Sequence, residues 1–259
     1  MAVKNDGLIL RIERTSIHDG KGLRVVVFLK GCPLSCKWCS TPESQQMDVE
    51  KGYGRILTVD QVLDEICKDE IFFFHSGGGV TISGGECLLQ PDFVAGVLEG
   101  SLRRGVNTAI ETSLFAPWHS VQKVLPYVNT AYVDLKHPDG VMHKKFVGVD
   151  NSLIFANLKK LDQSDLLFDI HIRIPLIPGI NDADDTLLAT LSIAESIKKL
   201  KEIEILPYHR LGVGTYARLG RSYELQDVAT PSREYIIERT EFVRKQKLDI
   251  PVKVGGGYL

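Results

Sequence analysis

The stretch Gly31-Cys32-Pro33-Leu34-Ser35-Cys36-Lys37-Trp38-Cys39-Ser40 contains three cysteines in a C-x3-C-x2-C spacing. Directly before it, residues 23–29 (LRVVVFL) form a short apolar run rich in β-branched residues, which predicts a buried strand. The cysteines therefore follow the carboxyl end of a strand, where α/β proteins place their ligands. Three thiolates on one short loop favour a soft metal centre.

Two kinds of metal centre fit this loop. A [4Fe–4S] cluster normally has four cysteine ligands, so a cluster with three would leave one iron open to a substrate. A structural zinc ion would need a fourth Cys or His, which His18 or Cys67 can supply. A disulfide framework is disfavoured, because there are five cysteines in 259 residues and no signal peptide. The spacing favours the cluster and leaves zinc open.

The composition is that of a soluble globular protein, with 44% hydrophobic and 25% charged residues. We expect one domain spanning residues 1–259. The formal net charge of −2 argues against a nucleic-acid binder driven by bulk electrostatics. No apolar run is long enough to cross a bilayer, and the first residues lack an apolar signal region. We expect a cytoplasmic monomer with no nucleic-acid or membrane partner.

Strand-like and helix-like stretches alternate along the chain, which predicts an α/β fold with a parallel sheet. Strands are expected at 23–29, 79–83, 107–112, 130–135, 168–174 and 203–206, with a short final strand at 251–254. Helices are expected at 58–71, 92–104, 118–127, 151–161, 182–200 and 232–246. A complete TIM barrel has eight βα units. Six units predict a partial (β/α)6 barrel, open on one side to a large partner.

Candidate binding residues stand at the carboxyl ends of the predicted strands, where active sites of parallel barrels lie. They are Gly84, Gly85, Glu86, Glu111, Thr112, Asp134, Lys136, Arg173 and His209. Two adjacent glycines allow the backbone to approach a ligand without interference from a Cβ atom. Each feature alone has a simpler structural interpretation. The glycines would form a tight turn, Asp134 and Lys136 would be solvated surface charges, and His209 would be a structural histidine. Their shared position favours a binding site.

Four motifs together resemble a known family. The cysteine motif resembles the signature of the radical S-adenosylmethionine (radical SAM) superfamily. Residues 16–24 (SIHDGKGLR) resemble the stretch S-I-H-D-G-P-G-x-R, residues 38–44 (WCSTPES) resemble W-C-S-N-P-E-S, and residues 83–86 match S-G-G-E. In this order they resemble the activating enzymes of glycyl radical enzymes, from about residue 8 to about residue 250.

The resemblance implies a cluster held by Cys32, Cys36 and Cys39, with S-adenosylmethionine (SAM) bound at the open iron. One electron from a flavodoxin or ferredoxin would cleave SAM to methionine and a 5′-deoxyadenosyl radical. That radical would take hydrogen from a glycine Cα in a partner of the pyruvate formate-lyase or dehydratase/lyase type. Two alternatives stay open: a radical SAM enzyme acting on a small molecule, and a non-catalytic metal-binding module.

The resemblance also assigns SAM contacts to individual residues. The S-G-G-E segment would bind the SAM amino group, a D-x-K segment would contact SAM, and the histidine of L-P-Y-H would contact the adenosyl part. The assigned residues are Trp38, Ser40, Gly84, Gly85, Glu86, Glu111, Thr112, Asp134, Leu135, Lys136, Arg173 and His209. Glu111 stands where the family commonly has Asp, at a position that helps to hold a monovalent cation.

The chain departs from the family in two places. Many relatives carry a cysteine-rich ferredoxin-like insertion after W-C-S-N-P-E-S, whereas residues 45–57 here contain no cysteine, so we expect one cluster. Lys21 stands where the family usually has Pro. Cys67 and Cys87 are expected to be packing residues, and Gly255-Gly256-Gly257 a flexible tail.

Overall fold

A computed structural model describes residues 5–246 and 249–255 of the chain. Contacts between residues divide it into two compact units, which are considered one at a time. The first unit comprises the described residues up to Pro33, Glu43–Ala131 and Asp165–Phe168. The second comprises Leu34–Pro42, Tyr132–Ser164 and the described residues from Asp169 onward. The short segment 34–42, which carries two of the three loop cysteines, therefore packs with the second unit.

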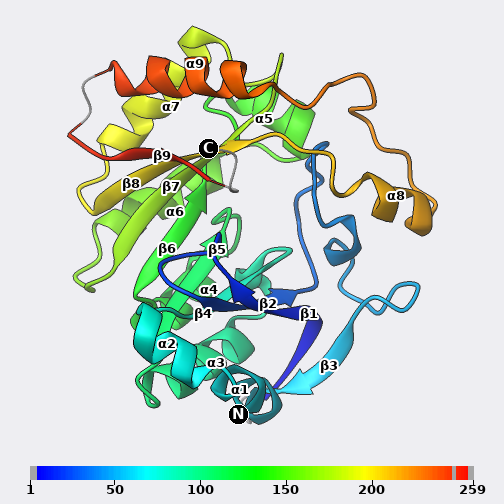
Figure 1. Ribbon diagram of the computed structural model, residues 1–259, viewed down its shortest axis with the longest axis vertical. Helices are drawn as coiled ribbons and strands as arrows, with labels where there is room; N and C mark the ends of the chain where they lie inside the picture. Colours follow the sequence, from blue (N-terminus) through cyan, green and yellow to red (C-terminus); the bar gives the residue numbers. More distant parts are fainter. Residues whose placement is uncertain (1–4, 247–248, 256–259) are drawn as a thin grey trace. The chain divides into compact units, whose positions relative to one another are not determined.

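Strands and helices alternate along most of the chain (Figure 1). The strands are β1 Asp6–Ser16, β2 Arg24–Leu29, β3 Arg55–Thr58, β4 Gly79–Gly84, β5 Asn107–Thr112, β6 Thr130–Asp134, β7 Asp169–Leu176, β8 Leu200–Pro207 and β9 Val252–Val254. The α-helices are α1 Val59–Cys67, α2 Glu70–Ser76, α3 Pro91–Leu102, α4 Trp118–Val124, α5 Gly140–Val147, α6 Ser152–Asp162, α7 Asp184–Glu195, α8 Val213–Leu219 and α9 Arg233–Arg244.

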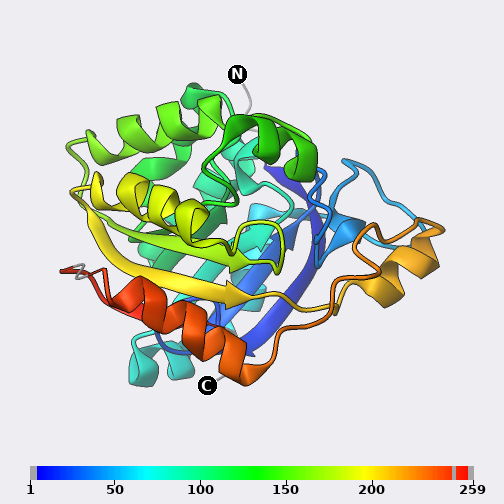
Figure 2. The ribbon, with the colours of Figure 1, turned by 90° about the horizontal axis from the view of Figure 1, so that it is seen from above.

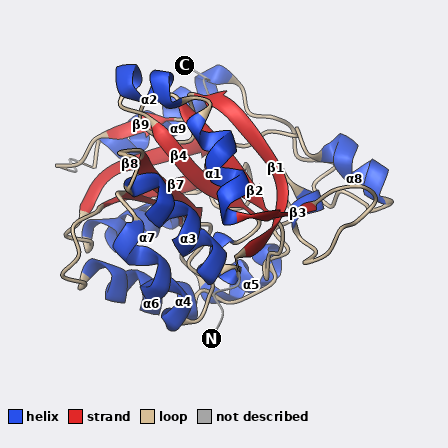
Figure 3. Cartoon of the chain, turned by 90° about the horizontal axis from the view of Figure 1, so that it is seen from below, coloured by secondary structure: helices blue, strands red, loops and turns tan. Residues whose placement is uncertain are grey.

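The strands of the first unit follow the order β3-β1-β2-β4-β5. β2, β4 and β5 pair in parallel, whereas β1 is antiparallel to both of its neighbours. Three consecutive valines of β2, residues 25–27, are fully buried, as expected of a parallel strand covered on both faces. The sequence did not predict β1 or β3, because the second half of β1 is polar. Helix α1 packs on α3, and α3 on α4 (Figure 3).

The single helix expected at 58–71 is wrong, because the chain forms α1 and α2 with a break at Lys68 and Asp69. Thr58 and Gln61 form a capping box that fixes the start of α1. At the break, the buried carboxylate of Asp69 accepts a hydrogen bond of 2.7 Å from Arg14 Nε of β1. Arg14 and Asp69 are far apart in sequence, so the apolar periodicity of residues 58–71 could not show that the helix breaks here.

In the second unit the strands follow the order β6-β7-β8-β9. β7 pairs in parallel with β8, and β8 with β9. Helices α7 and α9 are neighbours (Figure 1), and Arg239 of α9 donates to Asp184 Oδ1 of α7 at 2.6 Å. The helix expected at 182–200 ends at Glu195, and β8 already begins at Leu200. Helices α5 and α8 were not predicted.

The fold class agrees with the prediction. The six predicted strands correspond to β2, β4, β5, β6, β7 and β8, and the described strands are mostly parallel with helices between them. Within the described residues, β3 and β9 each have a strand partner on one side only, so no strand pairing closes a complete barrel. None of the described helices combines the length and apolar character needed to span a membrane.

Candidate functional site

The loop after β2 is closed at its base by backbone hydrogen bonds within the first unit. Gly31 N donates to Ser44 O at 2.7 Å, and Cys32 N donates to Gln45 O at 2.9 Å. The fully buried Lys30 reaches the same side of the loop, where its Nζ donates to Glu43 O at 2.7 Å. The position of Cys32 is therefore fixed by main-chain contacts on both sides of the loop.

Segment 34–42 is fixed by the last turn of α5. Ser35 N donates to Val147 O at 2.8 Å, and Lys37 N donates to Phe146 O at 3.0 Å. The helix ends at Gly148, which has φ +93°, and a Cβ there would lie 2.2 Å from Ser35 Oγ. A glycine is therefore needed at this position for two reasons: the left-handed backbone and the close approach of the segment.

All three loop cysteines carry reduced, half-buried thiols. Burial raises the pKa of Cys36 to about 12, while Lys136 opposes this rise and Cys39 and Asp134 add to it. The metal-free thiol is thus protonated at neutral pH, and iron binding would release its proton. Three reduced thiols on one anchored loop fit a [4Fe–4S] cluster with one open iron.

Among residues 5–246 and 249–255, no three or more His, Cys, Asp or Glu side chains are grouped so that they could hold an ion. In a cluster each thiolate binds a different iron atom, so cluster ligands stand further apart than the ligands of one ion.

The S-G-G-E turn after β4 is bonded directly to the start of the cysteine loop. Gly85 N donates to Leu29 O at 3.0 Å, and Glu86 N donates to Gly31 O at 2.7 Å. A Cβ on Gly84, where φ is +114°, would lie 2.2 Å from Leu29 N, and one on Gly85 would lie 2.1 Å from Gly31 O. Both glycines are therefore required by backbone packing in addition to any role with a ligand.

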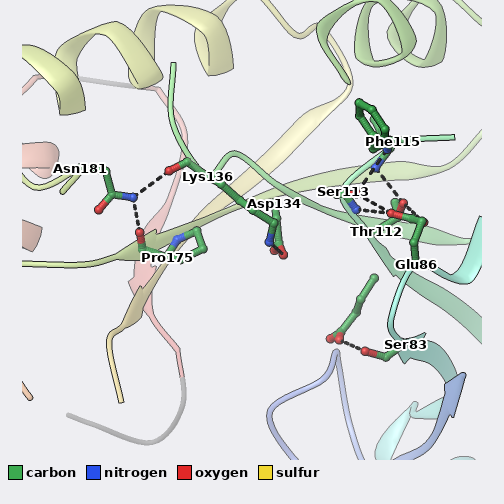
Figure 4. Close-up of polar contacts among 11 residues, drawn as sticks. Ser83, Glu86, Thr112, Ser113, Phe115, Asp134, Lys136, Pro175 and Asn181 are labelled. Carbon is green, nitrogen blue, oxygen red and sulfur yellow. Dashed lines mark hydrogen bonds and ion pairs between the residues drawn. The ribbon is translucent and has the colours of Figure 1, made fainter. Parts of the chain in front are cut away.

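The buried side chain of Glu86, with 1% of its surface exposed, links the turn after β4 to the end of β5 in the first unit (Figure 4). Its Oε1 accepts from Thr112 Oγ1 at 2.6 Å and from Leu88 N at 3.1 Å. Its Oε2 accepts from Ser113 N at 2.9 Å and from Ser113 Oγ at 2.5 Å. Four bonds match the accepting capacity of a carboxylate, so Glu86 fixes the turn through its side chain.

Glu111 is half-buried at the end of β5. Ser83 Oγ, from the end of β4, donates to Glu111 Oε2 at 2.5 Å (Figure 4). The buried thiol of Cys87 donates to Glu111 O at 3.4 Å, and burial together with the Glu86 carboxylate raises the pKa of Cys87 well above its usual value. Cys87 is thus a packed, protonated thiol as predicted, whereas Cys67 is half-exposed at the end of α1 and not buried as expected.

In the second unit, Asp134 and Lys136 form an ion pair at the end of β6, with Lys136 Nζ 2.7 Å from Asp134 Oδ2 (Figure 4). Leu135, between them, points into the core and donates its N–H to Arg173 O at 2.9 Å. The D-x-K segment therefore presents two polar side chains on one side of the strand, and its middle residue serves packing.

Asn181 is a buried residue that sequence reasoning missed. Its Nδ2 donates to Lys136 O at 2.9 Å and to Pro175 O at 2.5 Å, and its Oδ1 accepts from Ile177 N at 2.8 Å. One amide side chain thereby joins the ends of β6 and β7 (Figure 4). The turn signal Pro-Gly before it, at 178–179, marked a loop but not this contact.

Arg173 is buried and already paired with a carboxylate. Its Nε donates to Glu204 Oε2 of β8 at 2.6 Å, and its guanidinium lies 4.4 Å from the centre of the Tyr132 ring. Gly255 follows β9 and packs on the same carboxylate, since a Cβ there would lie 2.4 Å from Glu204 Oε1. Gly255 is buried and donates to Ile205 O at 2.9 Å, so the expectation of a flexible tail is wrong for this residue. Residues 256–257 lie outside the described residues.

The remaining candidate side chains belong to the second unit. His209 follows β8, and burial lowers its pKa, so the imidazole is neutral at pH 7. Its Nδ1 accepts a hydrogen bond of 3.4 Å from Leu211 N. Trp38 is buried and Ser40 is exposed on segment 34–42. Of the cysteine triad, Cys32 belongs to the first unit, whereas Cys36 and Cys39 belong to the second.

Comparison with known proteins agrees with this geometry. Residues 26–191 match the model of the radical SAM superfamily. The (2S)-3-sulfopropanediol dehydratase activating enzyme of Klebsiella oxytoca is 34% identical over 288 positions, which cover 88% of this chain and 90% of the relative. The isethionate sulfite-lyase activating enzyme of Nitratidesulfovibrio vulgaris is 33% identical over 303 positions, covering 95% and 97%.

A solved structure shows the same relationship. A domain of pyruvate-formate lyase-activating enzyme from Bacteroides vulgatus superimposes with a TM-score of 0.56 at 29% identity, covering 70% of this chain and all of that one. The radical SAM match spans more than half of this chain, and the two relatives are aligned over most of their length. This chain therefore belongs to the radical SAM superfamily and, within it, to the activating enzymes of glycyl radical enzymes.

Proposed function

We propose that this enzyme installs the glycyl radical of a partner of the dehydratase or lyase type. The observation that carries the proposal is the loop after β2, where three reduced thiols follow a buried parallel strand and the S-G-G-E turn is hydrogen-bonded to the loop's first residue. Membership of the superfamily implies a [4Fe–4S] cluster and SAM. When bound, they supply reductive cleavage of SAM to a 5′-deoxyadenosyl radical, which removes hydrogen from a glycine Cα.

We further propose a single cluster, ligated by Cys32, Cys36 and Cys39. Its support is the short connection of residues 45–57, which holds no cysteine. In addition, the alignments with the two relatives run over 288 and 303 positions, more than the 259 residues of this chain, so the relatives contain residues without a counterpart here.

The residues of both units have distinct proposed roles toward SAM. Gly84 and Gly85 offer main-chain groups to its amino group, while Glu86 and Thr112 hold that turn in place. In the second unit, Asp134 and Lys136 bind polar groups of SAM. The other proposed contacts are Trp38, Ser40, Glu111, Leu135 through its backbone, Arg173 and His209. Arg173 is paired with Glu204, so we propose that it contacts SAM while this ion pair stays intact.

Partners and cofactors beyond the cluster and SAM rest on the family resemblance. We propose a flavodoxin or ferredoxin as electron donor, a monomeric cytoplasmic enzyme with one catalytic domain, and no nucleic-acid or membrane partner. We also propose that Glu111 takes the family's Asp position in holding a monovalent cation. Ser83 orients the Glu111 carboxylate by donating to its Oε2.

The direct test combines the reduced protein, SAM and a candidate glycyl radical enzyme in the absence of oxygen. We expect a glycine-centred doublet by electron paramagnetic resonance, together with transfer of deuterium from the labelled target glycine into 5′-deoxyadenosine. A protein without its reconstituted cluster serves as the control and should give neither signal.

Cleavage of SAM without either signal, across the dehydratase and lyase partners, would reject the activating role. In that case a radical SAM reaction on a small molecule takes its place, and turnover of SAM should then depend on a metabolite and on no protein partner. One zinc ion and no sulfide in the reconstituted protein would instead indicate a non-catalytic metal-binding module.

A further inference from the structure

Residues 208–225, which follow β8 and include α8, form a segment that we call the capping segment. It contacts segment 34–42 of the same unit at three points. Gly212 packs so closely that a Cβ there would lie 2.8 Å from Cys39 O and 2.9 Å from Ser40 O. Arg221 Nη1 donates to Pro42 O at 3.1 Å, and Glu224 Oε2 lies 2.7 Å from Lys37 Nζ. Figure 1 and Figure 2 both show α8 beside this part of the chain.

The capping segment contains three buried tyrosines, Tyr208, Tyr216 and Tyr223, and Tyr216 has 8% of its surface exposed. Burial raises the pKa of Tyr216, and Cys39 and Cys36 raise it further, so both cysteines lie within electrostatic reach of the phenol. Tyr216 also lies one helical turn after Gly212, with its N–H donating to Gly212 O at 3.1 Å, so it is on the side of α8 that contacts Cys39 and Ser40.

Two neighbouring tyrosines of the capping segment support the Tyr216 ring. It packs edge-on against Tyr223, with ring centres 5.2 Å apart, and Tyr223 shares a hydrogen bond of 2.7 Å with the buried Tyr208 hydroxyl. Arg221 N also donates to Tyr216 O at 2.9 Å. Tyr208 directly follows β8, so the ring is tied to the sheet through two aromatic neighbours.

We propose that the capping segment covers the Cys36 and Cys39 side of the cluster and that the Tyr216 ring excludes water and dioxygen from it. This inference rests on the proposed cluster. Tyr216 is a positioning and shielding residue, since it acts through the surroundings of the iron and not on the reacting atoms. Its ring, and not its hydroxyl, supplies the shielding.

Shielding has two measurable consequences. Dioxygen that reaches the iron oxidises the cluster and is itself reduced, and water can then replace the cluster's ligands, so a covered cluster survives longer in air. A reduced cluster also carries one more negative charge than the oxidised form, and low-polarity surroundings disfavour that charge. Covering the cluster therefore lowers its reduction potential, and removing the cover raises it.

The experiment compares reconstituted wild-type protein with Tyr216→Ala, Tyr216→Phe and Tyr235→Ala. Tyr235 is a matched control, because it is a tyrosine of helix α9 in the same unit whose hydroxyl donates to Asp182, just before α7. The decay of the visible cluster absorbance in air and the midpoint of a redox titration followed by electron paramagnetic resonance are measured for each protein. We expect several-fold faster decay and a higher potential for Tyr216→Ala, and wild-type behaviour for Tyr216→Phe and Tyr235→Ala.

Gly212→Ala provides a second variant in case Tyr216→Ala fails to fold. Its Cβ would push the capping segment away from Cys39 while keeping Tyr216, and we expect the same faster decay. Decay and potential equal to wild type in Tyr216→Ala, or decay as fast in Tyr216→Phe as in Tyr216→Ala, would overturn the inference. A wild-type protein that takes up no cluster would overturn the proposed function as well, so the two failures are distinguishable.

Discussion

Cys36 and Cys87 both carry reduced thiols whose pKa is raised by burial, but their neighbours differ in charge. Lys136 lowers the pKa of Cys36 while Cys39 and Asp134 raise it, whereas the carboxylates of Glu86 and Glu111 both raise the pKa of Cys87. A nearby cation favours the thiolate that binds iron, and nearby carboxylates disfavour it. The cation beside Cys36 thus distinguishes the proposed ligand from a packing residue of the same type.

We predict that Cys36→Ala abolishes cluster uptake, whereas Cys87→Ala and Cys67→Ala preserve it. Iron and sulfide are counted after anaerobic reconstitution, and the wild-type protein should contain about four irons per chain. Equal loss of cluster absorbance in all three variants would contradict the ligand assignment. A wild-type value near eight irons, roughly two clusters, would contradict the single cluster.

Glu86 gives a second prediction for a single residue. In Glu86→Gln, an NH2 group replaces one carboxylate oxygen and faces donors such as the Ser113 N–H and hydroxyl. We expect the free energy of unfolding to fall by about 1–3 kcal/mol, the cost of leaving a buried polar group unpaired. Urea unfolding measures this loss.

The control for this experiment is Glu99→Gln, which removes an exposed ion pair with Arg103 on α3. Surface pairs of this kind contribute about 0.3–0.5 kcal/mol, so the control should stay close to wild type. Similar losses in both variants would show that the buried bonds of Glu86 are not important for stability.

At the scale of elements, the end of α5 fixes the cysteine segment, and Gly148 makes this possible. Gly77 at the end of α2 is a matched position, because it also has a left-handed backbone but no atom within 4 Å of the place where a Cβ would lie. The two glycines therefore separate backbone strain from the clash with Ser35.

We predict that Gly148→Ala lowers both stability and iron uptake, whereas Gly77→Ala lowers stability alone. The left-handed backbone costs an alanine about 1–2 kcal/mol at either site. At residue 148 the methyl group would also lie 2.2 Å from Ser35 Oγ, so the side chain of Ser35, which directly precedes Cys36, must turn away. Urea unfolding and iron content are measured for both variants, and equal iron content in the two would argue against α5 as the support of the loop.

At the scale of the whole molecule, three histidines of the second unit, two of them buried and His209 half-buried, make stability depend on pH. Burial lowers the pKa of His137, His143 and His209 in the folded protein. An unfolded histidine titrates near pH 6.5. Below that pH the unfolded chain binds more protons than the folded one, so the free energy of unfolding falls as the pH falls.

We predict a loss of stability from about pH 6.5 downward, by at most about 1.4 kcal/mol per pH unit for each histidine. Urea unfolding of the iron-free protein measures it, so that cluster loss does not contribute. His143→Gln should flatten the dependence, and His119→Gln, at an exposed residue, should not. Constant stability between pH 6.5 and about pH 5.5 would contradict the role of burial.

The sequence by itself determined the features that depend on neighbouring residues. The buried valines of β2 and the exact span of β5, Asn107–Thr112, follow from short apolar runs bounded by turn residues. The spacing of the loop cysteines and the motifs around them indicated the family, because ligands on one loop are close in sequence as well as in space.

The tertiary structure alone decided the contacts between residues far apart in sequence. Glu86 reaches Ser113, Asn181 reaches Lys136, and Arg14 reaches Asp69 at the break between α1 and α2. Local periodicity carries no information about such partners, and helix α8 is too short to show a period. The residues that support the site could therefore not be read from the sequence, whereas the proposed metal ligands could.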